Sequence, residues 1–232
     1  MDPDASPVKT RRRYDSSGRQ DRARLVQAHV LGVAEQLFLR GGYASTTVAA
    51  IAATAGVSVE TIYKTFGGKP GLIRAIAQAG LAGSGPTPAP VRADEMSARG
   101  LDPHATLRHW ATLQTEVMPR VAPINLLVRS AAATDPDMAA LLDDINEQRL
   151  TRMHHNARRL GDRGQLRPGM TTERARDVMF AYTAPEFYDI LVNRQKWSID
   201  LYGDFIYRGL VAELLSPRSH RPSDDSAPTA GQ

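Results

Sequence analysis

Apolar residues recur at helical spacing along most of the 232-residue chain. In the segment 22–40, for example, they fall three or four positions apart, and Gly41-Gly42 predicts the end of this first helix. The apolar positions that define its inner face are Val26, Val30, Val33 and Leu37. No segment alternates apolar and polar residues for long enough to indicate a strand. The pattern therefore predicts an all-α protein.

Three short helices are predicted to follow the first one. Thr46 and Thr47 are good N-cap types ahead of a short apolar face that Gly56 closes, and Ser58 caps a second helix over 59–66. The last of these three helices, which is the fourth of the chain, spans about 70–81 and begins with a proline in its first turn. Two helices joined by a tight glycine turn have the spacing of a helix-turn-helix, although helix pairs of this kind are common in helical proteins.

A Pro/Gly/Ser-rich stretch after the fourth helix indicates an internal boundary. The sequence beyond this boundary again has helical periodicity. The first and last residues of the chain have the polar composition of flexible segments. We therefore predict a flexible basic arm (1–20), a helix-turn-helix domain (21–82), a linker or loop (83–101), a helical domain (102–215) and a flexible tail (216–232).

In the second domain, Asp-Pro pairs and single prolines mark the expected helix ends. Asp102 and Asp135 each precede a proline, as an N-cap precedes a first-turn proline. A proline inside the penultimate helix, Pro185, is expected to kink it near Ala181 and to open room for a ligand. The predicted helices run from 102 to about 118, 124–133 after a turn bracketed by Pro119 and Pro123, 138–160, 171 or 172 to about 196, and 198–215.

Composition excludes several kinds of chemistry. The chain has no cysteine, so disulfides, thiolate nucleophiles and cysteine-bound zinc are ruled out. It has no apolar leader and no run of 18 apolar residues, which predicts a cytoplasmic protein with no membrane partner. The pairs His104/His109 and His154/His155 have no carboxylates spaced to join them, so we expect no metal and no cofactor.

The net charge of +4 is concentrated at one end. Residues 1–80 hold eleven Lys/Arg and six Asp/Glu, a net of +5, whereas residues 81–232 have a net of −1. Within residues 1–80, the segment 9–24 contributes +5, the segment 25–80 contributes only +2, and the first eight residues contribute −2. This asymmetry favours a polyanionic partner for the N-terminal part, and the alternative is a solvated basic tail without a partner.

The run GGYASTTVAAIAATAGVSVETIYKTFGGKPGL resembles the DNA-binding domain of the TetR/AcrR transcriptional regulators. Matching positions, from Phe38 to Leu72, keep one spacing over about 35 residues. The stretches RVAPINLLVRSAAATDPDMAALLDDINEQRL and YTAPEFYDILV look like the ligand-binding domain of an actinobacterial-type subset. Glu60 and Pro70-Gly71 depart from the family pattern, which leaves the operator sequence open.

The resemblance implies a DNA-binding role for the second helix of the motif. We expect Tyr63, Lys69 and Thr47 to contact phosphates, and Thr61 and Lys64 to contact base edges. The alternative is that Tyr63 only packs the domain and Lys64 is a solvated charge. The basic arm either tracks the backbone or adds nonspecific affinity. The full predicted set is Thr46, Thr47, Ser58, Val59, Glu60, Thr61, Tyr63, Lys64, Lys69, Arg11, Arg12 and Arg13.

The resemblance also implies that the last two helices form a homodimer interface and that the central helices hold an effector pocket. Eight of the chain's 14 aromatic residues lie in those last helices. The interface residues expected are Tyr182, Tyr188, Trp197, Tyr202 and Phe205. The pocket residues expected are Trp110, Leu113, Met118, Asn125, Leu126, Met153, His154, Phe180 and Phe187, each of which could instead be ordinary core.

We therefore expect a ligand-responsive transcriptional regulator, most often a repressor in this family. It would bind a palindromic operator on double-stranded DNA as a dimer and be released by a small, mostly apolar molecule. The alternatives are an activator, or a DNA-binding protein of the same fold without an effector. An enzyme is disfavoured because no catalytic or nucleotide-binding motif appears. A nonspecific DNA-binding protein would leave the helical second domain unexplained.

Overall fold

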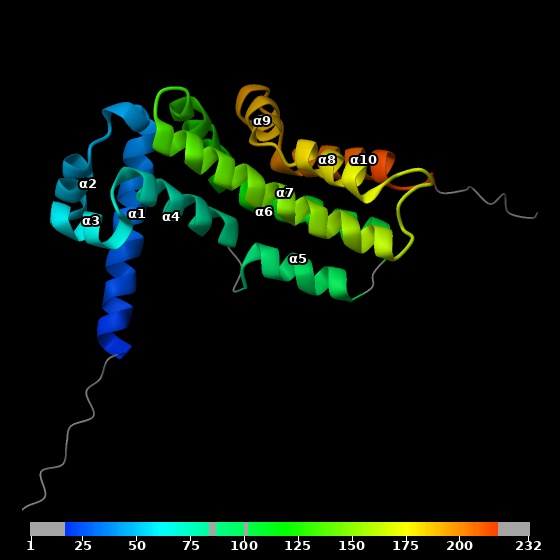
Figure 1. The fold of residues 1–232 in the computed structure, drawn as a ribbon, viewed down its shortest axis with the longest axis horizontal. Helices are drawn as coiled ribbons and strands as arrows, with labels where there is room; N and C mark the ends of the chain where they lie inside the picture. Colours follow the sequence, from blue (N-terminus) through cyan, green and yellow to red (C-terminus); the bar gives the residue numbers. More distant parts are fainter. Residues whose placement is uncertain (1–16, 84–86, 100–101, 218–232) are drawn as a thin grey trace, which may run out of the picture. The chain divides into compact units, whose positions relative to one another are not determined.

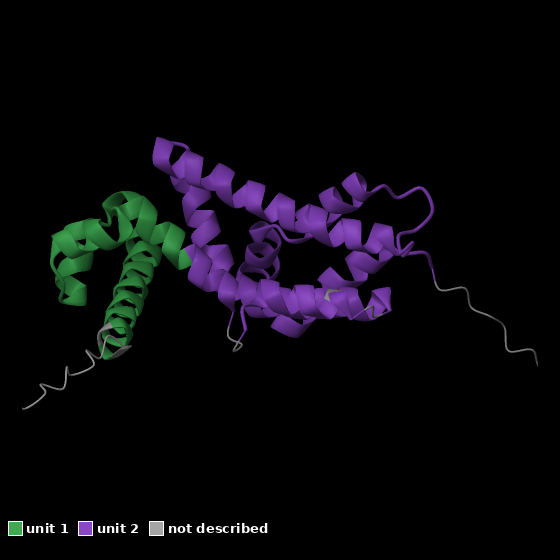
Figure 2. Cartoon of the chain, turned by 60° about the horizontal axis from the view of Figure 1, so that its bottom comes forward, with its two compact units in different colours: residues 1–76 green, residues 77–232 purple. Residues whose placement is uncertain are grey.

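The computed structural model describes residues 17–83, 87–99 and 102–217, and the secondary structure of these residues is helical throughout (Figure 1). The all-α prediction is confirmed for this part of the chain. The chain divides into two compact units, residues 1–76 (unit 1) and 77–232 (unit 2) (Figure 2). None of the described helices is long and apolar enough to cross a bilayer.

Unit 1 contains the helix-turn-helix. The N-caps predicted from sequence are confirmed, because the side chains of Thr47 and Ser58 accept hydrogen bonds from the amides of Ala50 and Thr61, each at 3.1 Å. The helices are α1 (Ser17–Ser45), α2 (Val48–Ala55), α3 (Val59–Phe66) and α4 (Lys69–Ala82), the last of which continues from unit 1 into unit 2.

The long first helix breaks at the predicted glycine pair. Gly42 has non-helical backbone angles, φ 78° and ψ 169°, and a short second helical segment follows it as far as Ser45. The positive φ of Gly42, which glycine adopts without steric cost, therefore ends the regular part of α1. A small apolar core joins the helices of the unit: Val30, Ala34, Phe38, Ile51, Ala52, Ile62, Leu72 and Ile73.

Unit 2 is a helical bundle built around α6. Asp102, Asp135, Thr171 and Ser198 accept hydrogen bonds from amides in the first turns of α6, α7, α8 and α10. The N-cap predictions for Asp102 and Asp135 are thereby confirmed. The helices are α5 (Ala89–Ala98), α6 (Pro103–Ala132), α7 (Pro136–Asp162), α8 (Thr172–Tyr182), α9 (Pro185–Tyr188), the π-helical turn η1 (Asp189–Arg194) and α10 (Ile199–Leu214).

The prediction of a turn between Pro119 and Pro123 is wrong, since α6 continues through both prolines. Each proline removes one backbone donor from the helix and disfavours helix locally. Long-range packing outweighs this cost, because the residues around the prolines bury a continuous apolar face. Those buried residues are Val117, Met118, Val121, Ala122, Ile124 and Val128.

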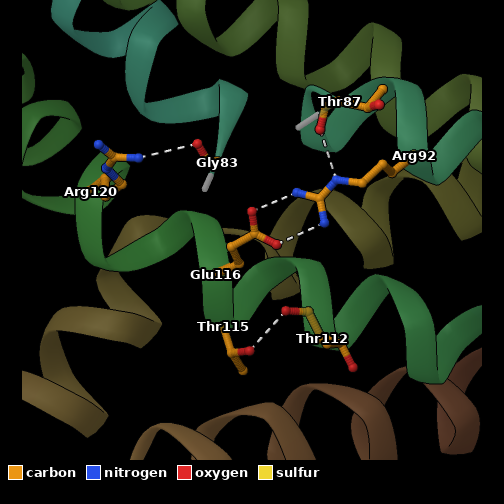
Figure 3. A network of polar contacts seen from close by, with 7 residues as sticks. All are labelled: Gly83, Thr87, Arg92, Thr112, Thr115, Glu116 and Arg120. Carbon is orange, nitrogen blue, oxygen red and sulfur yellow. Dashed lines mark hydrogen bonds and ion pairs between the residues drawn. The ribbon is translucent and has the colours of Figure 1, made fainter. Parts of the chain in front are cut away.

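The linker or loop expected over 83–101 contains a helix, α5. Ion pairs hold this helix on two sides. Arg92 forms two hydrogen bonds with the Glu116 carboxylate of α6 and donates Nε to the Thr87 carbonyl at 2.9 Å (Figure 3). On the other side, Asp94 accepts from Arg152 Nη1 of α7, with both oxygens at 2.8 Å. The Pro/Gly composition did not reveal these partners, because they lie far away in the sequence.

The single helix expected from 171 or 172 to about 196 is also wrong. Instead of kinking at Ala181, the chain leaves α8 after Tyr182 and starts α9 at Pro185. The residue before the proline, Ala184, has extended backbone angles (φ −67°, ψ 134°), which is the conformation that a following proline favours. The proline thus begins a new helix, and the gap leaves the buried Thr183 between the two.

Candidate nucleic-acid interface and ligand cavity

Helix α3 presents one apolar face to unit 1 and an exposed face outward. Ile62 is fully buried and anchors the inner face, whereas the side chain of Tyr63 is 55% exposed. The other outward residues are exposed as well: Val59, Glu60, Thr61, Lys64 and Thr65. A short helix with one buried anchor and a polar outer face suits insertion into a groove.

The turn before α3 fixes the start of this helix. Gly56 adopts the left-handed conformation at φ 66°, and its amide donates to the last carbonyls of α2. Ser58 then caps α3, and its hydroxyl lies 2.8 Å from the Thr61 hydroxyl. The first turn of α3 is therefore held in place before any partner binds.

The two threonines before α2 have different environments. Thr46 is buried, and its hydroxyl donates to the carbonyls of Gly42 and Leu37 at 2.8 and 3.2 Å. This burial does not support the DNA contact expected of Thr46, whose hydroxyl instead stabilises the end of α1. Thr47 is exposed and uses its oxygen only as an acceptor for the Ala50 amide, so its hydroxyl proton is available to a phosphate.

Tyr63 and Lys69 lie on the two sides of the glycine turn that follows α3. Gly68 has φ 105°, and a Cβ at this position would lie 3.2 Å from the Tyr63 ring, so the ring lies against the glycine. The Lys69 ammonium lies 4.0 Å from the centre of the Tyr43 ring. These aromatic contacts orient both side chains. Arg11, Arg12 and Arg13 lie outside the described residues.

Unit 2 contains a cavity of about 340 Å³ with mostly apolar walls. Side chains from α4, α5, α6, α7, α8 and α10 line it. Among the residues expected to form a pocket, those that line this cavity are Trp110, Leu113, Met118, Asn125 and Met153. Its size falls within the usual range for small-molecule sites.

The other four residues expected in the pocket do not line this cavity. His154 is exposed on α7, whereas Leu126, Phe180 and Phe187 are half-buried. The Arg149 guanidinium lies over the Phe180 ring, 3.8 Å from the ring centre. Phe187 stacks on Tyr182, with the two ring centres 5.9 Å apart. His154, Leu126 and Phe180 share helices with lining residues but face other neighbours, and Phe187 lies on α9, which contributes no lining residue. Sequence spacing did not resolve this difference.

Sequence reasoning missed the polar residues of the cavity wall. Arg149 and Arg152 both line it, one helical turn apart on α7, together with Gln114, Gln148, Asn156 and Thr183. Their polarity suggested a solvated face. The one available signal was spacing, because Arg149 lies four positions before the predicted lining residue Met153.

The residues expected at the dimer interface fall into two groups. Tyr202 and Tyr188 are buried within unit 2 and meet edge to face at 5.6 Å, so they belong to the chain's own core. Burial raises the pKa of both phenols. Tyr182, Trp197 and Phe205 are only half-buried, and Phe205 lies 6.0 Å from each of the other two rings. Only this second group reaches the surface.

No group of histidine and acidic side chains in the described part of the chain is arranged to hold a metal ion. The arrangement in unit 1 is instead that of a helix-turn-helix DNA-binding domain, the class of protein that its fold and exposed helix define. Residues 30–76 match the family described as "Bacterial regulatory proteins, tetR family". This segment is thereby identified as the DNA-binding domain of a TetR-family protein, and members of that family are regulators rather than enzymes.

Solved structures of such regulators share the fold of the chain. The SmeT–triclosan complex is 21% identical with a TM-score of 0.65, covering 89% of this chain and 100% of that one. NalD, the secondary repressor of the MexAB-OprM multidrug efflux pump in Pseudomonas aeruginosa, is 20% identical with a TM-score of 0.64, covering 83% and 98%.

A regulator from Saccharomonospora viridis in complex with choline also shares the fold, at 16% identity and a TM-score of 0.60, covering 84% of this chain and 100% of that one. No curated protein sequence matches the chain significantly. The expected membership of an actinobacterial-type subset stays a prediction.

Proposed function

We propose that the protein is a dimeric repressor that binds a palindromic operator and releases it when a small molecule occupies the cavity of unit 2. The observation that carries the DNA-binding part is α3, whose inner face is anchored by Ile62 while its polar residues face outward. A DNA-bound regulator of this kind acts in the cytoplasm. The proposal divides into base recognition, dimerisation and ligand coupling.

Base recognition is assigned to the outer face of α3. Thr61 presents a methyl group suited to thymine, and Lys64 is long enough to reach guanine O6 and N7. Thr47, Tyr63 and Lys69 surround this face with phosphate donors. Glu60 brings a negative charge to the first turn, which disfavours a phosphate there and leaves it to accept from a cytosine amino group.

Dimerisation is assigned to the outer face of α10 together with α8. Leu201 is 47% exposed, and the residues four and seven positions after it, Phe205 and Arg208, also reach the surface. Tyr182 of α8 packs on Gly209, where even a Cβ would overlap its ring, so α8 and α10 approach closely and offer one continuous face. A two-fold dimer would present two α3 helices to a palindromic site.

Ligand coupling is assigned to α4. Its first residues belong to unit 1, whereas Ala77 and Leu81 line the cavity of unit 2. A ligand that shifts Ala77 and Leu81 therefore acts on the same helix that holds Lys69. Ligand binding would favour conformations whose two α3 helices no longer match the operator, with a coupling of about 1–3 kcal/mol.

Selection of bound DNA from a random pool tests the proposal. We expect the purified protein to enrich a palindrome whose half-sites are centred about one helical turn apart. Footprinting of the selected duplex would then show protection of both half-sites. Retention of DNA without any enriched sequence would contradict the proposal and favour nonspecific binding.

A further inference from the structure

The cavity in unit 2 contains a positive charge whose position indicates what kind of molecule enters. Among the described residues that line it, the two charged ones are Arg149 and Arg152, and none carries a carboxylate. Arg152 is already neutralised, because both oxygens of Asp94 lie 2.8 Å from its Nη1. The charge of Arg149 is the one that remains to be balanced.

Arg149 is held in place by contacts that carry no full negative charge. Its Nη1 donates to the Thr183 carbonyl at 3.1 Å, and its guanidinium lies on the Phe180 ring. Its Nε is buried without an acceptor. Burial lowers the pKa of Arg149 to about 10, so the side chain is still charged at neutral pH. Glu186 is the acidic side chain that raises the pKa of Arg149, and its carboxylate pairs with Arg129.

Other buried polar atoms of the wall also lack partners. They are Trp110 Nε1, Gln114 Oε1 and Asn125 Oδ1, and the residues Trp110 and Asn125 are more than nine-tenths buried. The indole N–H can only donate, and so can Nε of Arg149. Two unused donors therefore call for acceptor oxygens on whatever fills the cavity, since a buried donor without an acceptor costs free energy.

We propose that the cavity binds an amphipathic carboxylate, with its apolar body against the side chains of α5 and α6 and its carboxylate on the Arg149 guanidinium. This inference rests on the proposed function, because it names the chemical class of the effector. The guanidinium binds a carboxylate through paired N–H groups, and the low polarity of the surrounding wall strengthens that attraction. A neutral molecule of the same shape could accept a hydrogen bond from Nε but would leave the charge of Arg149 unbalanced.

A binding experiment with matched probes tests the inference without DNA. Decanoate and 2-naphthoate are each compared with the corresponding alcohol, 1-decanol and 2-naphthalenemethanol, by titration calorimetry and by fluorescence of Trp110, measured in a Trp197→Phe background. We expect at least one carboxylate to bind at least tenfold more tightly than its alcohol. In Arg149→Gln this preference should fall to about twofold or less.

Two further variants show whether the preference for the carboxylate depends on the positive charge at position 149 itself. Arg149→Lys keeps the charge and should retain a clear preference for the carboxylate. Arg158→Gln removes an exposed arginine of the same helix, paired with Asp162, and should keep the full preference. Thermal unfolding of each variant verifies that it is folded.

Equal affinity for acid and alcohol, an unchanged preference in Arg149→Gln, or no binding of either carboxylate would overturn the inference. Each of these results would leave the selection of a palindromic operator untouched. Conversely, a protein that selects no DNA sequence would refute the proposed function while the carboxylate titrations could still succeed. The two failures are therefore distinguishable.

Discussion

At the scale of single residues, the structure distinguishes side chains next to α2 and α3 that the sequence could not. The caps at Thr47 and Ser58 and the left-handed Gly56 were predictable, because they depend on neighbours within three or four positions. The burial of Thr46 was not predictable, because its hydroxyl donates to a carbonyl nine positions away. Local rules therefore located the motif but did not tell a structural threonine from an exposed one.

Substitutions of Tyr63 and Lys64, which are neighbours on the exposed face of α3, are expected to weaken DNA binding in different ways. Tyr63→Ala should weaken binding to every DNA sequence, because a phosphate contact carries no base preference. Lys64→Ala should cost about 1–3 kcal/mol on the selected operator and relax one position of it. Random-pool selection repeated with each variant measures the difference. If the sequence selected by Lys64→Ala equals that of the wild type, Lys64 does not contact a base.

At the scale of elements, the errors of the sequence analysis have one physical cause. Proline and glycine indicate where a helix is locally disfavoured, but packing against distant segments decides whether it forms. Helix α6 passes through two prolines because its buried face is continuous, and α5 forms in a Pro/Gly-rich stretch because Arg92 and Asp94 find partners on α6 and α7. At Pro185 the local rule held, since the residue before the proline is extended and a new helix starts at the proline.

Replacement of Pro119 by alanine tests the continuity of α6. Because Pro119 is exposed within the helix, the change restores a backbone donor without opening a cavity. We expect the free energy of unfolding to rise by about 1–2 kcal/mol, which is less than the full cost of a mid-helix proline because the unfolded chain also gains entropy. Denaturant titration measures it, with Pro103→Ala at the first turn as the control. A lower stability for Pro119→Ala would mean that α6 is interrupted there.

The attachment of α5 is tested by removing its ion pair with α6. Both partners, Arg92 and Glu116, are only about one-fifth exposed, so Arg92→Met should loosen the attachment of α5 locally. We expect faster amide exchange over 89–98, measured by hydrogen–deuterium exchange, and little change in α8. Arg108→Met removes a more exposed pair with Asp204 and serves as the control. Equal exchange rates in Arg92→Met and the wild type would show that the ion pair does not hold α5.

At the scale of the whole molecule, charge and fold assign different tasks to the two units. The excess positive charge lies in the first 80 residues, with the DNA-binding motif, whereas the remainder is nearly neutral and contains an apolar cavity. This division was predictable from sequence. The shape of the cavity and the arginine in its wall were not, because they depend on which faces of six helices meet.

Dimerisation is tested at the same scale by placing a charge on the outer face of α10. Leu201→Arg should shift the protein from dimer to monomer in sedimentation experiments, because two such charges would meet across a two-fold interface. Operator affinity should fall with it. Val91→Arg, on the equally exposed Val91 of α5, should remain dimeric. A Leu201→Arg dimer as stable as the wild type would place the interface elsewhere.

The central claim is that occupancy of the cavity in unit 2 controls DNA binding by unit 1. The most direct test measures the affinity for the selected operator, by fluorescence anisotropy, before and after saturation with a compound that Trp110 fluorescence shows to occupy the cavity. The account predicts that the affinity falls about 5- to 150-fold, and that the operator weakens binding of the compound by the same factor. An operator affinity that is identical with the cavity empty and filled would contradict it.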